Sequence, residues 1–280
     1  MQLHLFKTAR KWDSCLLPID DNTLGLILQF RVRLVRIEPG SRFFMGSTYA
    51  LGDGFVMDEG RRFTLASWNN REWEAYQREF VRVVQRHWSD KFVLIPNKPW
   101  YSPRPGAPLT AAKINCGLSI ELVLSDGNAH QTYRIIHPTQ PFRSFADPEG
   151  RSGLFTHTDV EPEWNTSMTR MGRETHSVSF YQIAVNHEFG HTLGLAHVNG
   201  VGNSDWNYGV TLEQRENQLG LGSRLTSTHA RPWINRLKSH LIPRTHADST
   251  VHFTGTVDSL QLIEYWDNDW QPPEPTPART

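Results

Sequence analysis

The sequence lacks the features that would place it in an exported or membrane-bound class. Its 280 residues include only two cysteines, Cys15 and Cys116, so at most one disulfide can form. We interpret both as reduced thiols of a protein made in the cytoplasm. No apolar run reaches the roughly 18 to 20 residues that a membrane-spanning helix needs. The start, MQLHLFKTARKWDS, also lacks the basic and then apolar pattern of a signal peptide, and leaderless export stays open as an alternative.

Net charge is absent as well. The 29 Lys and Arg residues balance 29 Asp and Glu residues, so no excess charge indicates binding to nucleic acid or to an acidic membrane. The phosphate-binding GxxxxGK[ST], the dinucleotide-binding GxGxxG after a strand and the GxSxG of serine hydrolases are all missing. We therefore expect no nucleic-acid partner and no membrane partner, and the oligomeric state stays unknown.

Hydrophobic periodicity predicts several strands. Residues 24–37 place apolar side chains at every second position, which is the period of a half-buried strand. Shorter strands are predicted at 91–95, at 114–124, at 132–136 and within 251–265, with a turn signal at 125–128. The four prolines of residues 97–108 exclude regular structure there.

Three helices are predicted. Residues 71–88 have helical period, and Asn69 with Glu72 has the spacing of a capping box. A second helix is expected from Ser179, which has the same spacing to Gln182, as far as Gly194. The third covers residues 228–241. The order of strand, helix, several strands and helix indicates an α+β fold.

The segment HEFGHTLGLAH, residues 187–197, predicts a metal centre. On a helix, residues four apart share one face, so His187 and His191 can offer two imidazole nitrogens to one ion. Gly194 can adopt the positive φ that reverses the chain, which brings His197 in as a third ligand. Glu188 then lies beside the open position, where it can take a proton from bound water. This is the chemistry of a hydrolase with one catalytic Zn²⁺.

The pattern HExxHxxGxxH resembles that of the metzincin zinc peptidases, and HEFGHTLGLAH is most similar to the matrixin branch. Residues 77–95, QREFVRVVQRHWSDKFVLI, are similar to an early matrixin helix and strand. The resemblance implies a twisted mixed β-sheet with an active-site helix and a C-terminal helix. It implies zinc on His187, His191 and His197, with Glu188 as the general base. It also implies an endopeptidase that acts on a protein or peptide substrate bound along an edge strand.

The sequence departs from the metzincin pattern at one position. Metzincins carry a methionine in a turn beneath the zinc, whereas all five methionines here precede the ligands. Leu219, in a glycine-flanked turn, occupies the matching place, and we expect it to form the floor of the site and a wall of the S1′ subsite. Leucine and methionine have similar volumes, so this replacement costs less than ~1.5 kcal/mol.

Two further features of the family are matched poorly by this sequence. Neither cysteine lies in the Pro-Arg-Cys-Gly context of matrixin latency, so inhibition by a thiolate is not expected. His157, Asp159 and Trp164, in HTDVEPEW, resemble the matrixin segment that carries structural metal ligands. The other acidic residues do not match that segment in position, so we expect no second metal there.

The chain is divided into four segments. Residues 1–58 are predicted to be a β-rich extension of unassigned role, 59–245 the metzincin-like catalytic domain, 246–268 a C-terminal β segment and 269–280 a disordered proline-rich tail. Two alternatives to the endopeptidase stay open: a zinc-binding docking or structural module without turnover, and a zincin that hydrolyses a non-peptide amide. Glu188 argues against the first, because a structural zinc is normally closed by a fourth protein ligand.

Overall fold

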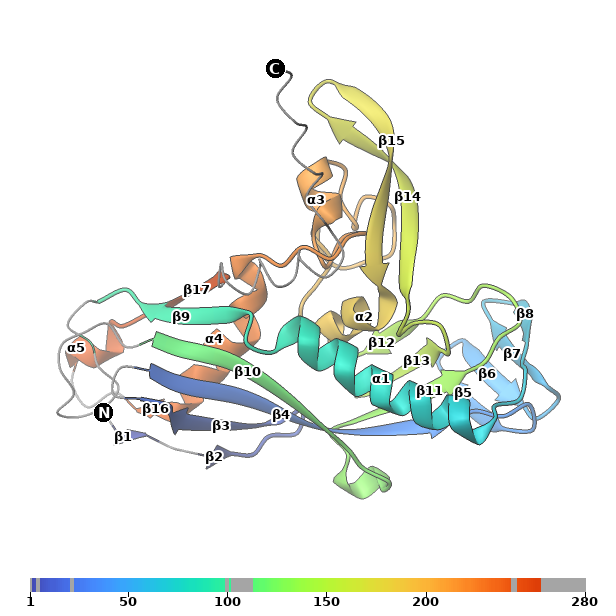
Figure 1. Cartoon of the computed structure of the whole chain (residues 1–280), viewed down its shortest axis with the longest axis horizontal. Coiled ribbons are helices and arrows are strands. Elements are labelled where there is room, and N and C mark those ends of the chain that lie inside the picture. Colours follow the sequence, from blue (N-terminus) through green and yellow to red (C-terminus); the bar gives the residue numbers. More distant parts are fainter. Residues whose placement is uncertain are drawn as a thin grey trace, which may run out of the picture.

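The computed structural model describes residues 2–3, 6–20, 23–98, 101, 113–242 and 246–257. These residues form a mixed α+β structure in which one large β-sheet carries the core and a few helices pack on it (Figure 1). None of the helices within the described ranges is long and apolar enough to cross a membrane.

Strand β4 (Thr23–Arg36), which its alternation predicts as a strand, lies at the centre of the large sheet. Strand β10 (Lys113–Leu122) runs parallel to it on one side. On the other side, β3 (Asp13–Pro18) pairs antiparallel with its first half, and β11 (Gln131–Ile136) pairs parallel with its last residues. The sheet also contains β2 (Phe6–Lys7), β9 (Phe92–Pro96), β12 (Phe145–Asp147), β13 (Ser152–Thr156) and β17 (Phe253–Val257).

The described strands outside this sheet form three smaller units. Strands β5 (Arg42–Met45), β6 (Thr48–Leu51), β7 (Phe55–Asp58) and β8 (Arg61–Thr64) make an antiparallel sheet at one end of the molecule (Figure 1). Strands β14 (Pro162–Met171) and β15 (Glu174–Ile183) make a hairpin that projects from the body. Strands β1 (Gln2–Leu3) and β16 (Leu241–Ile242) pair with each other.

Helix α1 (Asn70–Trp88) begins with the predicted capping box: the Asn69 side chain accepts from the Glu72 N–H, and Glu72 accepts from the Asn69 N–H. Its apolar face is buried on the sheet, and α1 packs beside α2 (Ala184–Thr192), which begins directly after β15. The predicted third helix is present as a 3₁₀ turn (Ser227–Ala230) followed by α4 (Arg231–His240). Short helices α3 (Leu212–Glu216) and α5 (His246–Ser249) and a 3₁₀ turn (Asp126–Asn128) complete the described elements.

One expectation about these elements is wrong. Ser179 does not start a helix: it lies in β15, paired with Thr166, and α2 begins at Ala184 without a side-chain cap. Residues 174–183 are rich in β-branched and aromatic side chains, and pairing along the whole of β14 satisfies their backbone. The predicted turn at 125–128 is present as the 3₁₀ turn Asp126–Asn128, and the strands that flank it, β10 and β11, lie on opposite sides of β4.

The predicted segments meet in one sheet. Strand β4, inside the predicted extension 1–58, is the central strand, and β17, inside the predicted C-terminal segment 246–268, pairs with β9. The segment boundaries themselves stay a prediction. The tail 269–280 and most of the proline-rich loop 97–108 lie outside the described residues.

Candidate metal centre

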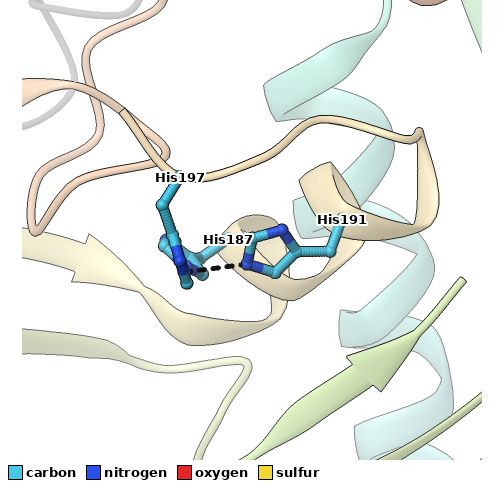
Figure 2. A group of neighbouring side chains, drawn as sticks. All are labelled: His187, His191 and His197. Atoms are coloured by element: carbon cyan, nitrogen blue, oxygen red, sulfur yellow. Dashed lines mark hydrogen bonds between the residues drawn. The ribbon is translucent and has the colours of Figure 1, made fainter. Parts of the chain in front are cut away.

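The three histidines of the predicted centre converge on one point (Figure 2). His187 and His191 lie one turn apart on α2, and the chain reverses at Gly194, whose φ is +82°. The Gly194 N–H donates to the His191 carbonyl, which closes the helix and brings His197 back over it. The Nε2 atom of His197 lies 3.0 Å from that of His191 and 3.1 Å from that of His187.

Each imidazole is held in one orientation by a backbone carbonyl. The Nδ1 atom of His187 lies 2.9 Å from the Gln218 carbonyl oxygen. That of His191 lies 2.8 Å from the carbonyl of Leu195, and that of His197 lies 2.6 Å from the carbonyl of Gly202. Because a carbonyl oxygen only accepts, every Nδ1 carries the proton, and in the neutral ring every Nε2 presents a lone pair.

The electrostatic environment keeps these rings neutral. Burial is the first cause and lowers the pKa of His187, of His191 and of His197, the last to about 4. For His187 and His197 the neighbouring imidazoles lower the pKa further. Three unprotonated Nε2 atoms in mutual contact repel one another unless a cation lies between them. Nitrogens bound to one tetrahedral zinc, each about 2.0–2.1 Å from the ion, lie about 3.3 Å apart, close to the spacing here.

The arrangement can therefore hold a metal ion. Within the described part of the chain, this is the one group of three His, Cys, Asp or Glu residues whose ligand atoms lie close enough to share an ion. The donor set is three neutral imidazoles, which suits a first-row transition metal. No fourth protein ligand belongs to the group, so one coordination position stays open for a water or a substrate.

Glu188 reaches the edge of the sheet from α2. Its Oε2 accepts from the N–H of Ala146 in β12, at 2.9 Å. Burial is the first cause that raises the pKa of Glu188 to about 8, and the charge of Asp159 raises it further, while the Ala146 N–H and Arg143 act the other way. A carboxyl with such a pKa exchanges its proton readily near neutral pH, and a nearby divalent cation favours its ionised form.

Leu219 lies in the turn beneath α2. It is buried against Gly190, where an added Cβ would meet the Leu219 Cδ1 at 3.2 Å. The Leu219 N–H donates to the side-chain oxygen of Asn217 at 2.8 Å, and the preceding Gln218 carbonyl is the acceptor for His187. Leu219 therefore packs under the helix that carries the ligands, while the lining of the cleft comes from other residues.

A cleft of about 650 Å³ opens over the centre. Strand β12 and the segment before it line one side, α2 and the loop after it line the base, and the small β5–β8 sheet contributes a further wall. Its lining includes Glu188, His191, His197, Arg143, Tyr208 and Phe44. The small sheet, whose role sequence reasoning left unassigned, thus borders the centre directly.

Sequence reasoning missed Tyr208 and Arg143. The Tyr208 ring packs against His197, with ring centroids 4.2 Å apart, and stacks on His187 at 5.7 Å. The Arg143 guanidinium donates to the Tyr208 hydroxyl. Neither residue belongs to a spacing motif, so no pattern in the sequence identifies them.

The residues that resembled a structural metal segment make separate contacts. His157 packs against His137, with ring centroids 3.8 Å apart and the rings tilted by 36°. The Asp159 carboxylate is buried and accepts from the hydroxyls of Ser144 and Thr156 and from the Thr156 N–H. Trp164 is exposed on β14.

Comparisons with family models, with curated proteins and with solved structures found no match to this chain.

Proposed function

We propose that the protein is a zinc-dependent endopeptidase of the metzincin type. The observation that carries this proposal is the convergence of three Nε2 lone pairs on one point, with an open coordination position and the carboxyl of Glu188 beside it. The family resemblance of HEFGHTLGLAH supports zinc as the ion and a peptide bond as the target. The edge strand β12 and the buried turn at Leu219, which both contact α2, are also features that the resemblance implies.

The division of labour among the residues follows from their positions. A bound zinc ion would polarise the carbonyl of the substrate and lower the pKa of a bound water towards ~7. Glu188, which does not belong to the ligand group, accepts the proton of the attacking water and passes it to the leaving amine. His187, His191 and His197 hold the ion as neutral donors, and the carbonyls on their Nδ1 atoms fix the tautomer throughout.

Strand β12 offers a place for the substrate. Among the described strands it pairs only with β13, so its outer edge borders the cleft. An extended peptide would add to this edge as a further strand through backbone hydrogen bonds. The Ala146 N–H, which contacts Glu188 here, lies on the same strand, so a peptide aligned with β12 passes the carboxylate at hydrogen-bonding range.

The test is Glu188→Ala, with Glu213→Ala, an exposed glutamate on α3, as the matched control. Glu188→Ala should keep its zinc, measured by elemental analysis, because the carboxylate is not a ligand. Cleavage of a mixed peptide library, followed by mass spectrometry, should fall by ~10²- to 10⁴-fold because proton transfer is lost. The control should match the parent in both measurements.

Two outcomes would reject the peptidase. In the first, Glu188→Ala cleaves peptides as fast as the parent. In the second, neither protein cleaves any peptide although both bind zinc firmly, in which case the docking-module alternative takes its place.

A further inference from the structure

An arginine beside the metal centre has no carboxylate partner among the described residues. Arg143, in the segment just before β12, lines the cleft together with Glu188, His191 and His197. Its guanidinium donates to the Tyr208 hydroxyl, and the Tyr208 ring in turn packs on the imidazole of His197. This chain of contacts fixes a positive charge next to the ligands.

That charge is not neutralised within the described residues. Arg143 makes no ion pair there, its side chain is exposed, and the one hydrogen bond that it makes occupies one of its five N–H donors. Besides Glu188, the carboxylates of Asp58, Glu59 and Asp147 line the cleft, and no ion pair joins any of them to Arg143 in the described part of the chain. Asp147 accepts the N–H groups of Glu149 and Gly150, and Asp58 accepts the Thr48 hydroxyl.

A guanidinium in this position favours one class of ligand group. Its planar fork of N–H donors matches the two oxygens of a carboxylate, which it binds more strongly than a neutral amide. A bound metal ion would add positive charge to the same cleft, so an anionic group is favoured further.

We propose that Arg143 is a specificity residue that binds a carboxylate of the substrate next to the scissile bond. The carboxylate belongs either to an Asp or Glu side chain or to the free C-terminus of the peptide. This inference rests on the proposed peptidase function for its substrate class, while the binding of a carboxylate at Arg143 can be measured without turnover.

The experiment uses short acetylated peptides in matched sets. One set carries Asp at each position in turn and an amidated C-terminus, a second replaces Asp by Asn, and a third combines Asn with a free C-terminal carboxylate. Binding to the zinc-loaded Glu188→Gln protein is measured by calorimetry, so that cleavage does not intervene. Arg143→Gln and Arg143→Lys are made in this background, with Arg173→Gln, at the exposed turn of the β14–β15 hairpin, as the control for net charge.

The protein with Arg143 should bind either the Asp set or the free-C-terminus set about tenfold more tightly than the amidated Asn set. Arg143→Gln should abolish this preference, Arg143→Lys should keep part of it because the charge remains without the fork, and Arg173→Gln should leave it unchanged. Which of the two carboxylate sets is preferred identifies the source of the group.

The inference is overturned if neither carboxylate set is preferred, or if Arg143→Gln keeps the full preference, because the metal alone would then explain it. The two proposals fail separately. A parent protein that cleaves no peptide, while its Glu188→Gln form shows the Arg143-dependent preference, retains the carboxylate site and loses the peptidase function. Cleavage without any carboxylate preference would retain the peptidase function and reject the carboxylate site at Arg143.

Discussion

This protein has two groups of closely packed histidines, and only one of them directs its imidazole nitrogens at a common point. In His187, His191 and His197 every Nδ1 donates to a backbone carbonyl and every Nε2 faces the others. In the pair His137 and His157 the tilted rings pack with centroids 3.8 Å apart, and both Nδ1 atoms are buried without a hydrogen-bond partner among the described residues.

The difference lies in the backbone around the rings. The three ligand imidazoles take their acceptors from three separate segments, namely the end of α2, the loop that follows it and the turn beneath it. The pair lies at the ends of the adjacent parallel strands β11 and β13, which hold the two rings against each other beside Trp68. Proximity of imidazoles therefore does not make a metal site unless carbonyl acceptors turn the nitrogens towards one point.

Removal of a ligand should give the largest effect. His191→Ala should lose most of the bound zinc, because two imidazoles hold the ion far more weakly than three. His157→Ala is the matched control from the other group and should keep about one zinc per chain. Elemental analysis of the purified proteins measures both, and full occupancy in His191→Ala would place the metal elsewhere. The metal-free parent should also melt at a lower temperature, because binding to the folded state alone stabilises it.

The carbonyl acceptors can be weakened without changing a ligand. The Asn217 side chain accepts from the Leu219 N–H at 2.8 Å and lies 3.1 Å from the His229 Nε2, so it holds the turn that presents the Gln218 carbonyl to His187. Asn217→Ala should lower zinc affinity by ~10-fold, within the range of outer-shell changes. Competition with a chromophoric chelator measures the affinity. An unchanged affinity would show that this turn does not orient His187.

Acid should lower the stability of the metal-free protein through His229, which contacts the same turn. Burial lowers the pKa of His229 to about 4 and that of His87 to about 3, so both stay neutral when folded. In the unfolded chain these two histidines take up protons near pH 6.5, whereas in the folded chain they do not. Their contribution to stability is therefore constant above about pH 6.5 and falls as pH drops towards 4.

For His229 alone this loss is on the order of 3 kcal/mol. Urea unfolding at pH 7, 5 and 4 should show the decline, and His229→Gln should reduce it. An equal decline in the variant would exclude His229 as a source of the acid sensitivity.

The smallest effect is expected beneath α2. Leu219→Met keeps the apolar volume against Gly190, so it should change the unfolding free energy by less than ~1.5 kcal/mol and leave zinc content unchanged. Leu219→Asp would bury an unpaired carboxylate at the same place and should damage both. Urea unfolding and elemental analysis compare the two. An aspartate variant with normal stability and zinc would show that this position tolerates water.

The sequence by itself determined the parts whose signal is local. The capping box of Asn69 and Glu72 and the helical period that follows it predicted α1, and strict alternation predicted β4 as a half-buried strand. The spacing of His187, His191 and Gly194 determined the geometry of the first two imidazoles and the reversal of the chain, because both depend on one helix and one positive φ.

Only the tertiary structure decided what surrounds those imidazoles. Residues 174–183 form a strand because β14 pairs with them, and β4 becomes the central strand because β10 and β11 arrive on its two sides. The Gln218 carbonyl that orients His187, and the approach of Arg143 to Tyr208, join segments far apart in the chain. Every residue carries the same backbone carbonyl whatever its side chain, so the sequence does not mark which carbonyl will accept a hydrogen bond from an imidazole. That role exists only once folding has brought the carbonyl to the ring.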